Sequence, residues 1–585
     1  MSKSAASLPI GSVAIPEARQ NIPATSREAA DKAVEALRAR KDAWAVMSIA
    51  ERVMLLDTLM DRTLAEAERW ARAGQDAKGI SPSSPTAGEE WLAGPAVMTR
   101  NIRLLKKSLE DIARFGAPQL PAEPFARVDG RVVATVFPTD NWDKLTFTGF
   151  SAEVWMQPEV TLANLPDHMA EFYRTRPTVG KVALVLGAGN VSSIGPMDAL
   201  YKLFVEGQVV ILKMNPVNEN LGPVFADIFQ PLADRGFFRL VYGGAAEGDY
   251  LCNHPGVEEI HITGSDKTYD AIVWGLGAEG ERRKRERTPR NTRRVSSELG
   301  NVSPIIVVPG PWSQDDIIYQ GVNLASSLTN NAGFNCNATR VVIQHASWSQ
   351  RDALNEALSK ALDRAEPRVP YYPGAEERHD RFLAAHPEAR QFGPDGAGKV
   401  PWTFIPGVPS DDAGDICFNT EAWCGVTSET ALTAGSVVEY IERAVDFAND
   451  RLWGTLSCSI IVHPKSLEDP AIANAVEKAI ADLRFGSVAV NHWAALAYAF
   501  VSTTWGAYPG HPPEDIRSGS GVVHNSYLFD KPQKSVVRGP FIVKPRPAWF
   551  NDHKTTQKLG PLLTRFNGKP SVRTLLPMLN QALRG

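Results

Sequence analysis

The 585-residue sequence has little cysteine, no long apolar run and no marked excess of either charge. Its five cysteines, at 252, 336, 417, 424 and 458, are too few and too scattered for a disulfide framework, and their odd number leaves at least one thiol free. No run of about eighteen apolar residues occurs, which predicts no membrane span, and the first twenty residues lack the apolar stretch of a secretory signal. These absences favour a reducing compartment, and we expect a cytoplasmic protein.

The charges nearly cancel, with 62 Lys plus Arg against 66 Asp plus Glu, a formal net charge of −4. This balance argues against a dedicated nucleic-acid or membrane-surface binder. One stretch, residues 280–294, concentrates eight Arg or Lys residues. A nucleic-acid or acidic-partner patch there is one interpretation, but we expect a solvated loop.

Short apolar runs alternate with helical patterns from residue 181 onward. They are VALVLG (182–187), QVVILK (208–213), RLVYGG (239–244), EEIHITGS (258–265), SPIIVVP (303–309), ATRVVIQ (338–344) and SVAVN (487–491). Nearly all-apolar strands separated by helices are typical of a buried parallel sheet with βαβ crossovers. We therefore predict an α/β protein with two such units in tandem. Residues 26–74 and 95–115 have helical periodicity, and residues 366–416 are expected to be mostly loop.

Three segments contain groups suited to nucleophilic catalysis. Cys336 lies in TNNAGFNCNATRVVI, between a predicted helix and a predicted strand, where backbone N–H groups can lower the pKa of a thiol. Glu298, in SSELGN, is a candidate general base if it is shielded from water. Asn190, in GAGNVSSIGP after the strand at 182–187, offers an amide donor to an oxyanion. Each signal is weak alone, and Ser192 breaks the Gly-x-Gly-x-x-Gly dinucleotide pattern.

The order of the segments is more specific than any one of them. GAGN, VVILKMNP (209–216), HITGS (261–265), SSELGN (296–301), GFNC (333–336) and EAWCG (421–425) follow one another at domain-scale intervals. This series resembles the aldehyde dehydrogenase superfamily over roughly residues 180–510. The resemblance implies an aldehyde-dehydrogenase-like α/β fold with two Rossmann-like parallel-sheet domains, one for the cofactor and one for catalysis, plus a β-hairpin oligomerisation element.

The resemblance also implies roles for individual residues. Cys336 matches the catalytic thiol, Glu298 the general base and Asn190 the oxyanion-binding amide. The cofactor-binding positions are Lys213 for the adenosine ribose, Gly264 and Ser265 for the phosphates, and Glu421 for the nicotinamide ribose. The implied reaction is oxidation of an aldehyde to a carboxylic acid with NAD or NADP, through a cysteine thiohemiacetal and a thioester.

Some positions depart from the family pattern, and rival functions stay open. Asn215 stands where the family often has a carboxylate for the ribose, which leaves NAD against NADP undecided. Phe334 precedes the thiol where Gln is common, and Cys424 replaces Gly. One rival is a CoA-acylating aldehyde dehydrogenase or acyl-CoA reductase, and the other is a non-catalytic binding or scaffold protein with the same fold.

The resemblance divides the chain into parts. We expect a flexible arm (1–25), a cofactor-binding domain (26–130 and 176–298), an oligomerisation element (131–175 with 535–550), a catalytic domain (299–534) and a helical C-terminal tail (551–585). A strand at 540–547 is expected to pair with a neighbouring subunit in a homodimer or homotetramer.

The expected partner is a small-molecule aldehyde, apolar or aromatic because residues 491–511 are rich in aromatic side chains. We predict no nucleic-acid partner. Cys252, His254 and His261 lack a second ligand pair with suitable spacing, which predicts no metal site.

Overall fold

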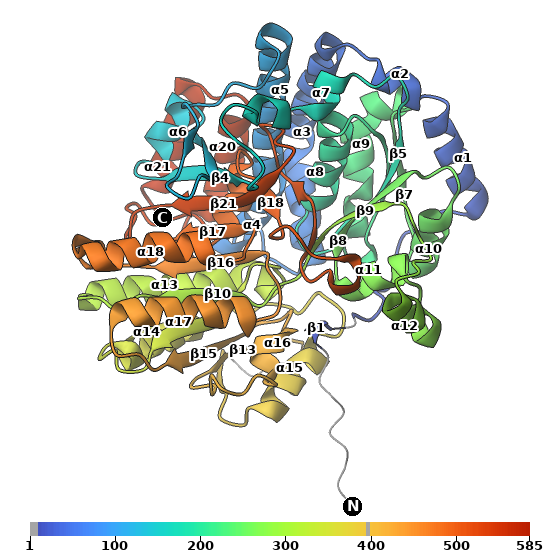
Figure 1. Cartoon of the computed structure of the whole chain (residues 1–585). Coiled ribbons are helices and arrows are strands. Elements are labelled where there is room, and N and C mark those ends of the chain that lie inside the picture. Colours follow the sequence, from blue (N-terminus) through green and yellow to red (C-terminus); the bar gives the residue numbers. More distant parts are fainter. Residues whose placement is uncertain (1–9, 14, 394–397) are drawn as a thin grey trace, which may run out of the picture.

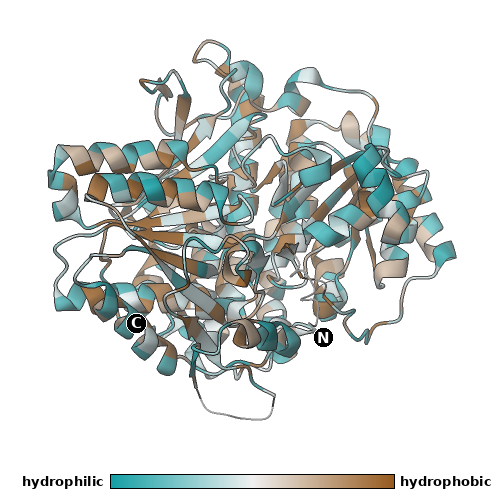
Figure 2. Cartoon of the chain, turned by 60° about the horizontal axis from the view of Figure 1, so that its bottom comes forward, coloured by the Kyte–Doolittle hydropathy of each residue, from teal (hydrophilic) through white to brown (hydrophobic). Residues whose placement is uncertain are grey.

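The computed structural model describes residues 10–13, 15–393 and 398–585. Two sheets form the body of the molecule and lie side by side, each covered by helices (Figure 1). Figure 2 shows the hydrophobic strands inside and hydrophilic colour on the outward faces of the helices. No helix in the described part of the chain is both long and apolar enough to cross a bilayer.

The first sheet has six strands in the order β19-β9-β8-β5-β6-β7. The strands are β5 (Val182–Leu186), β6 (Val209–Lys213), β7 (Phe238–Val241), β8 (Glu259–Gly264), β9 (Arg294–Leu299) and β19 (Gly519–Ser520). All pair in parallel except β19, which is antiparallel to β9. The helices α1 (Arg27–Arg38), α8 (Ile194–Leu200), α9 (Gly222–Asp234), α10 (Ala245–Asn253) and α11 (Asp266–Val273) pack against this sheet or beside it. Because helices cover both faces of this sheet, its strands consist almost entirely of apolar residues. This apolar sequence is the pattern from which they were predicted.

The second sheet has eleven strands in the order β12-β13-β15-β11-β10-β16-β17-β21-β4-β3-β2. Its parallel part is β13 (Trp402–Ile405), β15 (Val426–Leu432), β11 (Thr339–His345), β10 (Ser303–Val307), β16 (Ser457–Ile461), β17 (Ser487–Val490) and β21 (Pro532–Arg538). The antiparallel strands are β12 (Arg390–Phe392) at one end and β4 (Ser151–Met156), β3 (Val132–Phe137) and β2 (Phe125–Ala126) at the other. Helices α13 (Gln314–Thr329), α14 (Arg351–Asp363), α17 (Val437–Asp450) and α18 (Pro470–Asp482) accompany it.

The extended excursion at 132–156 joins the second sheet within the same chain. β4 pairs antiparallel with β21, the last strand of the parallel run, and β21 pairs in parallel with β17. The prediction of a strand at 540–547 is wrong: the strand lies earlier, at 532–538, and residues 540–547 are irregular. Within the chain, β21 lies between β17 and β4.

Two further segments differ from the sequence prediction. The basic stretch is not a loop at its start, because residues 277–286 form α12 (Gly277–Glu286). Arg282 and Arg283 pair with Glu279 one turn away, which favours a helix. Residues 366–416 contain α15 (Ala375–Ala385), α16 begins at Ile416, and both β12 and β13 fall inside this expected loop.

Helices from the two ends of the chain pack together. α3 (Ile49–Ala77) and α5 (Val97–Phe115) lie against α20 (Thr556–Gly568), which in turn contacts α21 (Val572–Ala582). The C-terminal tail is thus made of docked helices, as its leucine pattern predicted. Between α3 and α5 the chain turns through α4 (Gly88–Trp91) and a kink at Gly94.

The N-terminal arm is docked along residues 10–13 and 15–25 rather than loose. It forms the short strand β1 (Gly11–Ser12), which pairs in parallel with β14 (Thr420–Glu421). At its other end, Thr25 exchanges hydrogen bonds with Tyr242 at the end of the first sheet.

Candidate active site

Three predicted cofactor residues, Lys213, Gly264 and Ser265, and the predicted base Glu298 lie at one edge of the first sheet, whereas the fourth cofactor residue, Glu421, lies in β14 outside it. Lys213 ends β6, Gly264 ends β8, and Glu298 lies one residue before the end of β9. Because these strands are parallel, their carboxyl ends share one edge, the usual ligand-binding edge of an open α/β sheet. Ser265 caps the N-terminus of α11 and accepts a hydrogen bond from the Thr268 N–H.

The loop that carries Cys336 lies between α13 and β11, at the amino end of β11 in the second sheet. Asn331, Ala332 and Gly333 all have positive φ angles, which turn the chain sharply before the thiol. At Gly333 a side chain is excluded, because a Cβ atom would lie 2.8 Å from the carbonyl oxygen of Cys424. Arg340 donates to the carbonyl oxygens of both Gly333 and Cys424, at 2.7 and 2.6 Å. The loop is therefore fixed by backbone geometry and by a buried guanidinium.

Cys336 and Glu298, 38 positions apart in sequence, meet in the interior. Burial raises the pKa of Glu298 to about 8, while interactions with Cys336 and Trp505 oppose the rise. Burial also raises the pKa of the Cys336 thiol, and the nearby carboxyls of Glu298 and Glu421 raise it further. One carboxyl oxygen of Glu298, Oε1, is buried and has no hydrogen-bond partner among the residues that the structure describes. The pair is thus a thiol beside a carboxyl that is able to take its proton.

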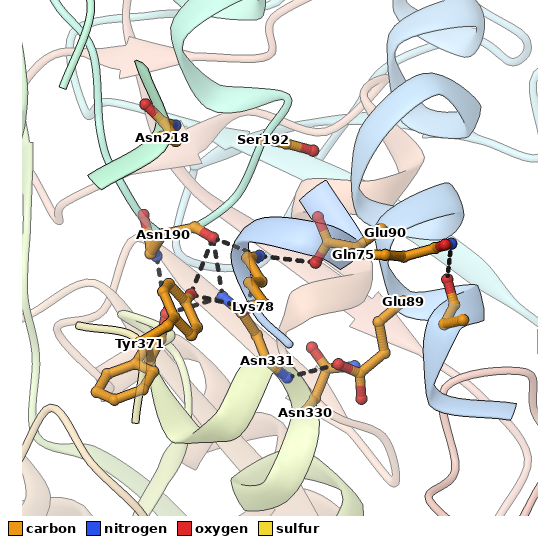
Figure 3. Close-up of polar contacts among 12 residues, drawn as sticks. Gln75, Lys78, Glu89, Glu90, Asn190, Ser192, Asn218, Asn330, Asn331 and Tyr371 are labelled. Atoms are coloured by element: carbon orange, nitrogen blue, oxygen red, sulfur yellow. Dashed lines mark hydrogen bonds and ion pairs between the residues drawn. The ribbon is translucent and has the colours of Figure 1, made fainter. Parts of the chain in front are cut away.

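Asn190 lies in the loop after β5 and contacts the loop that carries the thiol. Its amide Nδ2 donates to the carbonyl oxygen of Phe334, at 3.0 Å. Figure 3 shows the side chains of Lys78, Asn331 and Tyr371 converging on the Asn190 backbone. The structure therefore brings Asn190 to the Cys336 loop.

Glu421 is buried in β14, and its carboxylate is held from two sides. Its Oε1 accepts from the Asn301 N–H at 3.2 Å, and its Oε2 accepts from the Ser12 hydroxyl at 3.1 Å. Burial raises the pKa of Glu421 to about 7, against the favourable charge of Arg340. A Cβ at Gly300 would clash with this carboxylate, which explains the glycine there.

Lys213 is buried at the end of β6. Burial lowers its pKa to about 8, and the carboxylates of Glu247, Glu17 and Glu219 counteract this effect. Its ammonium has no hydrogen-bond partner among the described residues. A buried donor of this kind, at the edge where ligands bind, is suited to a ligand hydroxyl.

Several residues of the site were not predicted from the sequence. Lys78, Asn331 and Tyr371 contact Asn190, and Ser12 contacts Glu421. No motif marks them. The positive-φ asparagine before Gly333 was the one local signal available, because asparagine tolerates that conformation.

The aromatic segment at 491–511 has mixed roles. Tyr498 and Trp505 interact with the Cys336–Glu298 pair, and the Tyr498 hydroxyl lies 2.8 Å from the Ser193 hydroxyl. Phe500 instead stacks on Phe137 in the core, with ring centroids 4.0 Å apart. Part of this segment therefore borders the thiol, and part is packing.

One group of potential metal ligands occurs among the described residues, formed by His386, Asp415 and Cys417. His386 is already hydrogen-bonded to Asp415 and to Glu388, at 3.1 and 2.9 Å. Those bonds raise the pKa of His386, since both partners are carboxylates. The group is explained as an ion-paired histidine.

Comparison with known proteins agrees with this geometry. Residues 142–370 match the family model described as "Aldehyde dehydrogenase family". This part of the chain is therefore similar to the aldehyde dehydrogenase family. The 4-trimethylaminobutyraldehyde dehydrogenase of Homo sapiens is 30% identical over 141 residues, 24% of this chain and 25% of the relative. The B form from Danio rerio is 31% identical over 140 residues, 24% of each chain. The match thus spans about a quarter of the length of these curated relatives.

Solved aldehyde dehydrogenase structures match most of the chain. The substrate-bound AldH of Staphylococcus aureus has a TM-score of 0.58 at 16% identity, covering 88% of this chain and 95% of its own. The NAD-dependent aldehyde dehydrogenase of Sinorhizobium meliloti has a TM-score of 0.57 at 19% identity, covering 90% and 89%. At these identities the likeness establishes the aldehyde dehydrogenase fold, as the sequence predicted.

Proposed function

We propose that this protein oxidises an aldehyde to the carboxylic acid with NAD or NADP as hydride acceptor. The observation that carries the proposal is the meeting of the partly exposed Cys336, beside one sheet, with the buried Glu298, on the other. A thiol and a carboxyl with perturbed pKa values in contact form a nucleophile and its base.

The residues support each step of this chemistry. Glu298 takes the proton of Cys336, and the thiolate adds to the aldehyde carbonyl to form a thiohemiacetal. Asn190 stabilises the oxyanion. Loss of a hydride converts the thiohemiacetal to a thioester on Cys336. After Glu298 has released the thiol proton to solvent, it takes a proton from water; the resulting hydroxide equivalent adds to the thioester, and the Cys336 thiolate leaves as the acid forms.

The chain's own groups fit a nicotinamide dinucleotide, which when bound supplies the hydride acceptor. Lys213 is a buried residue whose ammonium makes no hydrogen bond within the described part of the chain, and Gly264 is open, since a Cβ there would meet only the Ile262 side chain at 3.5 Å. Ser265 stands at the start of α11, where N–H groups favour anions. Glu421, whose charge acts on the Cys336 thiol, offers a carboxylate to ribose hydroxyls.

The aldehyde is proposed to be apolar or aromatic, because Tyr498 and Trp505 border the Cys336–Glu298 pair. Their rings also suit a quaternary ammonium group through cation–π contacts. The aldehyde panel therefore includes octanal, phenylacetaldehyde and 4-trimethylaminobutyraldehyde, the compound named in the curated relatives.

The test is formation of NAD(P)H at 340 nm by the native protein and by Cys336→Ala. The control is Cys458→Ala, which removes a buried thiol in β16. We expect activity in the native protein and the control and none in Cys336→Ala. Full activity in Cys336→Ala contradicts the proposal, and acid formed only when CoA is added would favour the CoA-acylating alternative.

A further inference from the structure

Lys78 lies at the C-terminal end of α3, outside every segment that carries the proposed chemistry. It is buried, and its ammonium donates to three oxygens: Glu90 Oε1 at 2.7 Å, the Asn190 carbonyl at 2.9 Å and Asn331 Oδ1 at 2.8 Å. These contacts use all three N–H donors of the lysine. The ion pair with Glu90 is almost fully shielded, with side-chain exposures of 8% and 4%.

The contacts of Lys78 connect the loop that follows a strand of the first sheet with the Cys336 loop of the second sheet. The proposed site lies between these two loops. Asn190 follows a strand of the first sheet, and Asn331 precedes Cys336 on the second. The Asn190 carbonyl accepts from Lys78, from Asn331 Nδ2 at 3.1 Å and from the Tyr371 hydroxyl at 3.2 Å (Figure 3). Asn331 Nδ2 also donates to the Phe334 carbonyl at 3.1 Å. The network therefore fixes the backbone of Asn190 relative to the Cys336 loop.

The amide of Asn190 keeps some freedom. One N–H of its Nδ2 points to Phe334, and no second hydrogen bond of that amide occurs among the described residues. A fixed backbone with one spare amide proton suits a donor that awaits a substrate oxygen.

We propose that Lys78 is a positioning residue that aligns the Asn190 amide with the reacting carbonyl at Cys336. The proposal rests on the proposed aldehyde oxidation. Lys78 acts through its hydrogen bond to Asn190. The Glu90 carboxylate neutralises the positive charge of the Lys78 ammonium.

The test uses the double variant Lys78→Met with Glu90→Gln. Replacing Lys78 alone would leave the Glu90 carboxylate buried and unpaired, which can unfold a protein. The matched control is Arg351→Met with Glu429→Gln, which removes another ion pair, between α14 and β15, where Glu429 is fully buried.

We expect kcat of the Lys78/Glu90 variant to fall by about tenfold or more, because small misplacements of a reacting group are costly. The KM for cofactor and the rate of Cys336 alkylation by iodoacetamide should not change, since alkylation forms no oxyanion. The control pair should keep its kcat. An unchanged kcat, an equal loss in the control, or alkylation that falls in parallel overturns the proposal. Absence of turnover in the native protein would instead overturn the proposed function.

A second inference concerns the N-terminal arm, which touches the proposed cofactor residues. The Ser12 hydroxyl donates to Glu421, and the Ser12 N–H donates to Asp266 Oδ1 at 3.1 Å, directly after Ser265. Lys267 Nζ holds the Ile10 carbonyl at 2.9 Å. The arm therefore lies on both the start of α11 and β14.

The other half of the arm lies near Lys213. Glu17 Oε1 accepts from the Ala245 N–H at 3.0 Å, at the start of α10, and its charge acts on Lys213. Glu219, also a neighbour of Lys213, accepts from the Ile22 N–H at 2.9 Å. The arm thus runs from the Lys213 region to Glu421, the two ends of the proposed cofactor site.

We infer that residues 10–13 and 15–25 form an autoinhibitory strap, which lies against the proposed cofactor residues and must leave them before a dinucleotide can reach Glu421. This inference also rests on the proposed function. A cofactor then binds only the fraction of molecules with the strap released, which weakens its apparent affinity.

The test compares cofactor dissociation constants of the full chain and of a chain that begins at residue 19, by calorimetry with NAD+ and with NADP+. We expect the shorter chain to bind at least one of them about fivefold more tightly, and a peptide of residues 1–18 to reverse the gain. In case truncation harms folding, Ser12→Ala with Glu17→Gln in the full chain is the second variant and should move the constant in the same direction. Equal constants overturn the strap, whereas no binding by either chain overturns the proposed cofactor.

Discussion

Replacing Glu298 by glutamine removes an ionisable group that the fold buries with one oxygen unpartnered. The pKa of this carboxyl rises from 4.5 to about 8 in the folded protein, mainly because burial disfavours its charge. This rise corresponds to about 5 kcal/mol, at about 1.4 kcal/mol for each pH unit. The charged carboxyl of Glu298 therefore lowers the free energy of unfolding, and the neutral amide of glutamine removes this destabilisation.

The sign of the effect depends on pH. Below pH 4.5 the carboxyl is protonated in both the folded and the unfolded chain, so the cost is absent. Between 4.5 and about 8 only the folded state holds the proton, and the free energy of unfolding falls as pH rises. Above about 8 the full cost applies. Glu298→Gln should therefore gain stability over the native protein by about 3 kcal/mol at pH 7 and about 5 kcal/mol at pH 9.

Thermal unfolding midpoints measured from pH 5 to pH 9 test this expectation. The difference in midpoint between Glu298→Gln and the native protein should widen up to about pH 8. Glu421→Gln is the matched comparison, because burial raises the pKa of that carboxyl to about 7, so its difference should stop widening one pH unit earlier.

Glu298→Gln should stabilise the protein but lower its activity. The kcat/KM of the native protein should rise with pH as the coupled Cys336–Glu298 pair loses a proton, and Glu298→Gln should lose most of its turnover. A midpoint difference that stays constant from pH 5 to pH 9 would refute the assignment of a buried carboxyl with a raised pKa.

Further measurements test other parts of the structure. Cys336 is the one cysteine that is not fully buried, so a thiol reagent should label one site per native chain, faster as pH rises because the pKa of this thiol is raised, and Cys336→Ala should abolish that labelling. Gly333→Ala should destabilise the protein by about 1–3 kcal/mol, because its φ of +79° suits glycine, and an unchanged unfolding midpoint would contradict this. The homodimer or homotetramer predicted from the sequence stays untested; light scattering of a 63.8 kDa species would contradict it.

The strands of the first sheet were predictable because their sequences are almost wholly apolar. β21 was not, since its sequence PQKSVVR reads as polar. Lys534 is nevertheless buried there, because its ammonium donates to the carbonyl oxygens of Ile480, Ala481 and Leu483 at the end of α18. Those carbonyls lack partners within the helix, and a cation at a helix C-terminus is favourable. A strand that is flanked by two other strands can therefore have a polar sequence, and its sequence pattern alone does not predict a buried strand.

Cys336, Glu298 and Asn190 were predicted as separate segments, and the fold brings them together. The spacing of these three residues in the sequence does not predict that they come together, because this depends on how the two sheets lie side by side. Lys78 and Ser12 lie far from any motif, and their roles arise only from the packing of α3 and of the arm. Long-range contacts of single polar side chains leave no periodic signal.

The pairing of β4 with β21 also has a consequence for biosynthesis. Gln157, just beyond β4, bonds the carbonyl oxygen of Pro532 across 375 residues. At about 5–20 residues per second, a ribosome needs roughly 20–75 s to make the partner after β4 has emerged. During that time the edge of β4 that will pair with β21 is exposed in the nascent chain. Because exposed strand edges template aggregation, a chaperone that shields nascent strands should raise the yield of this protein.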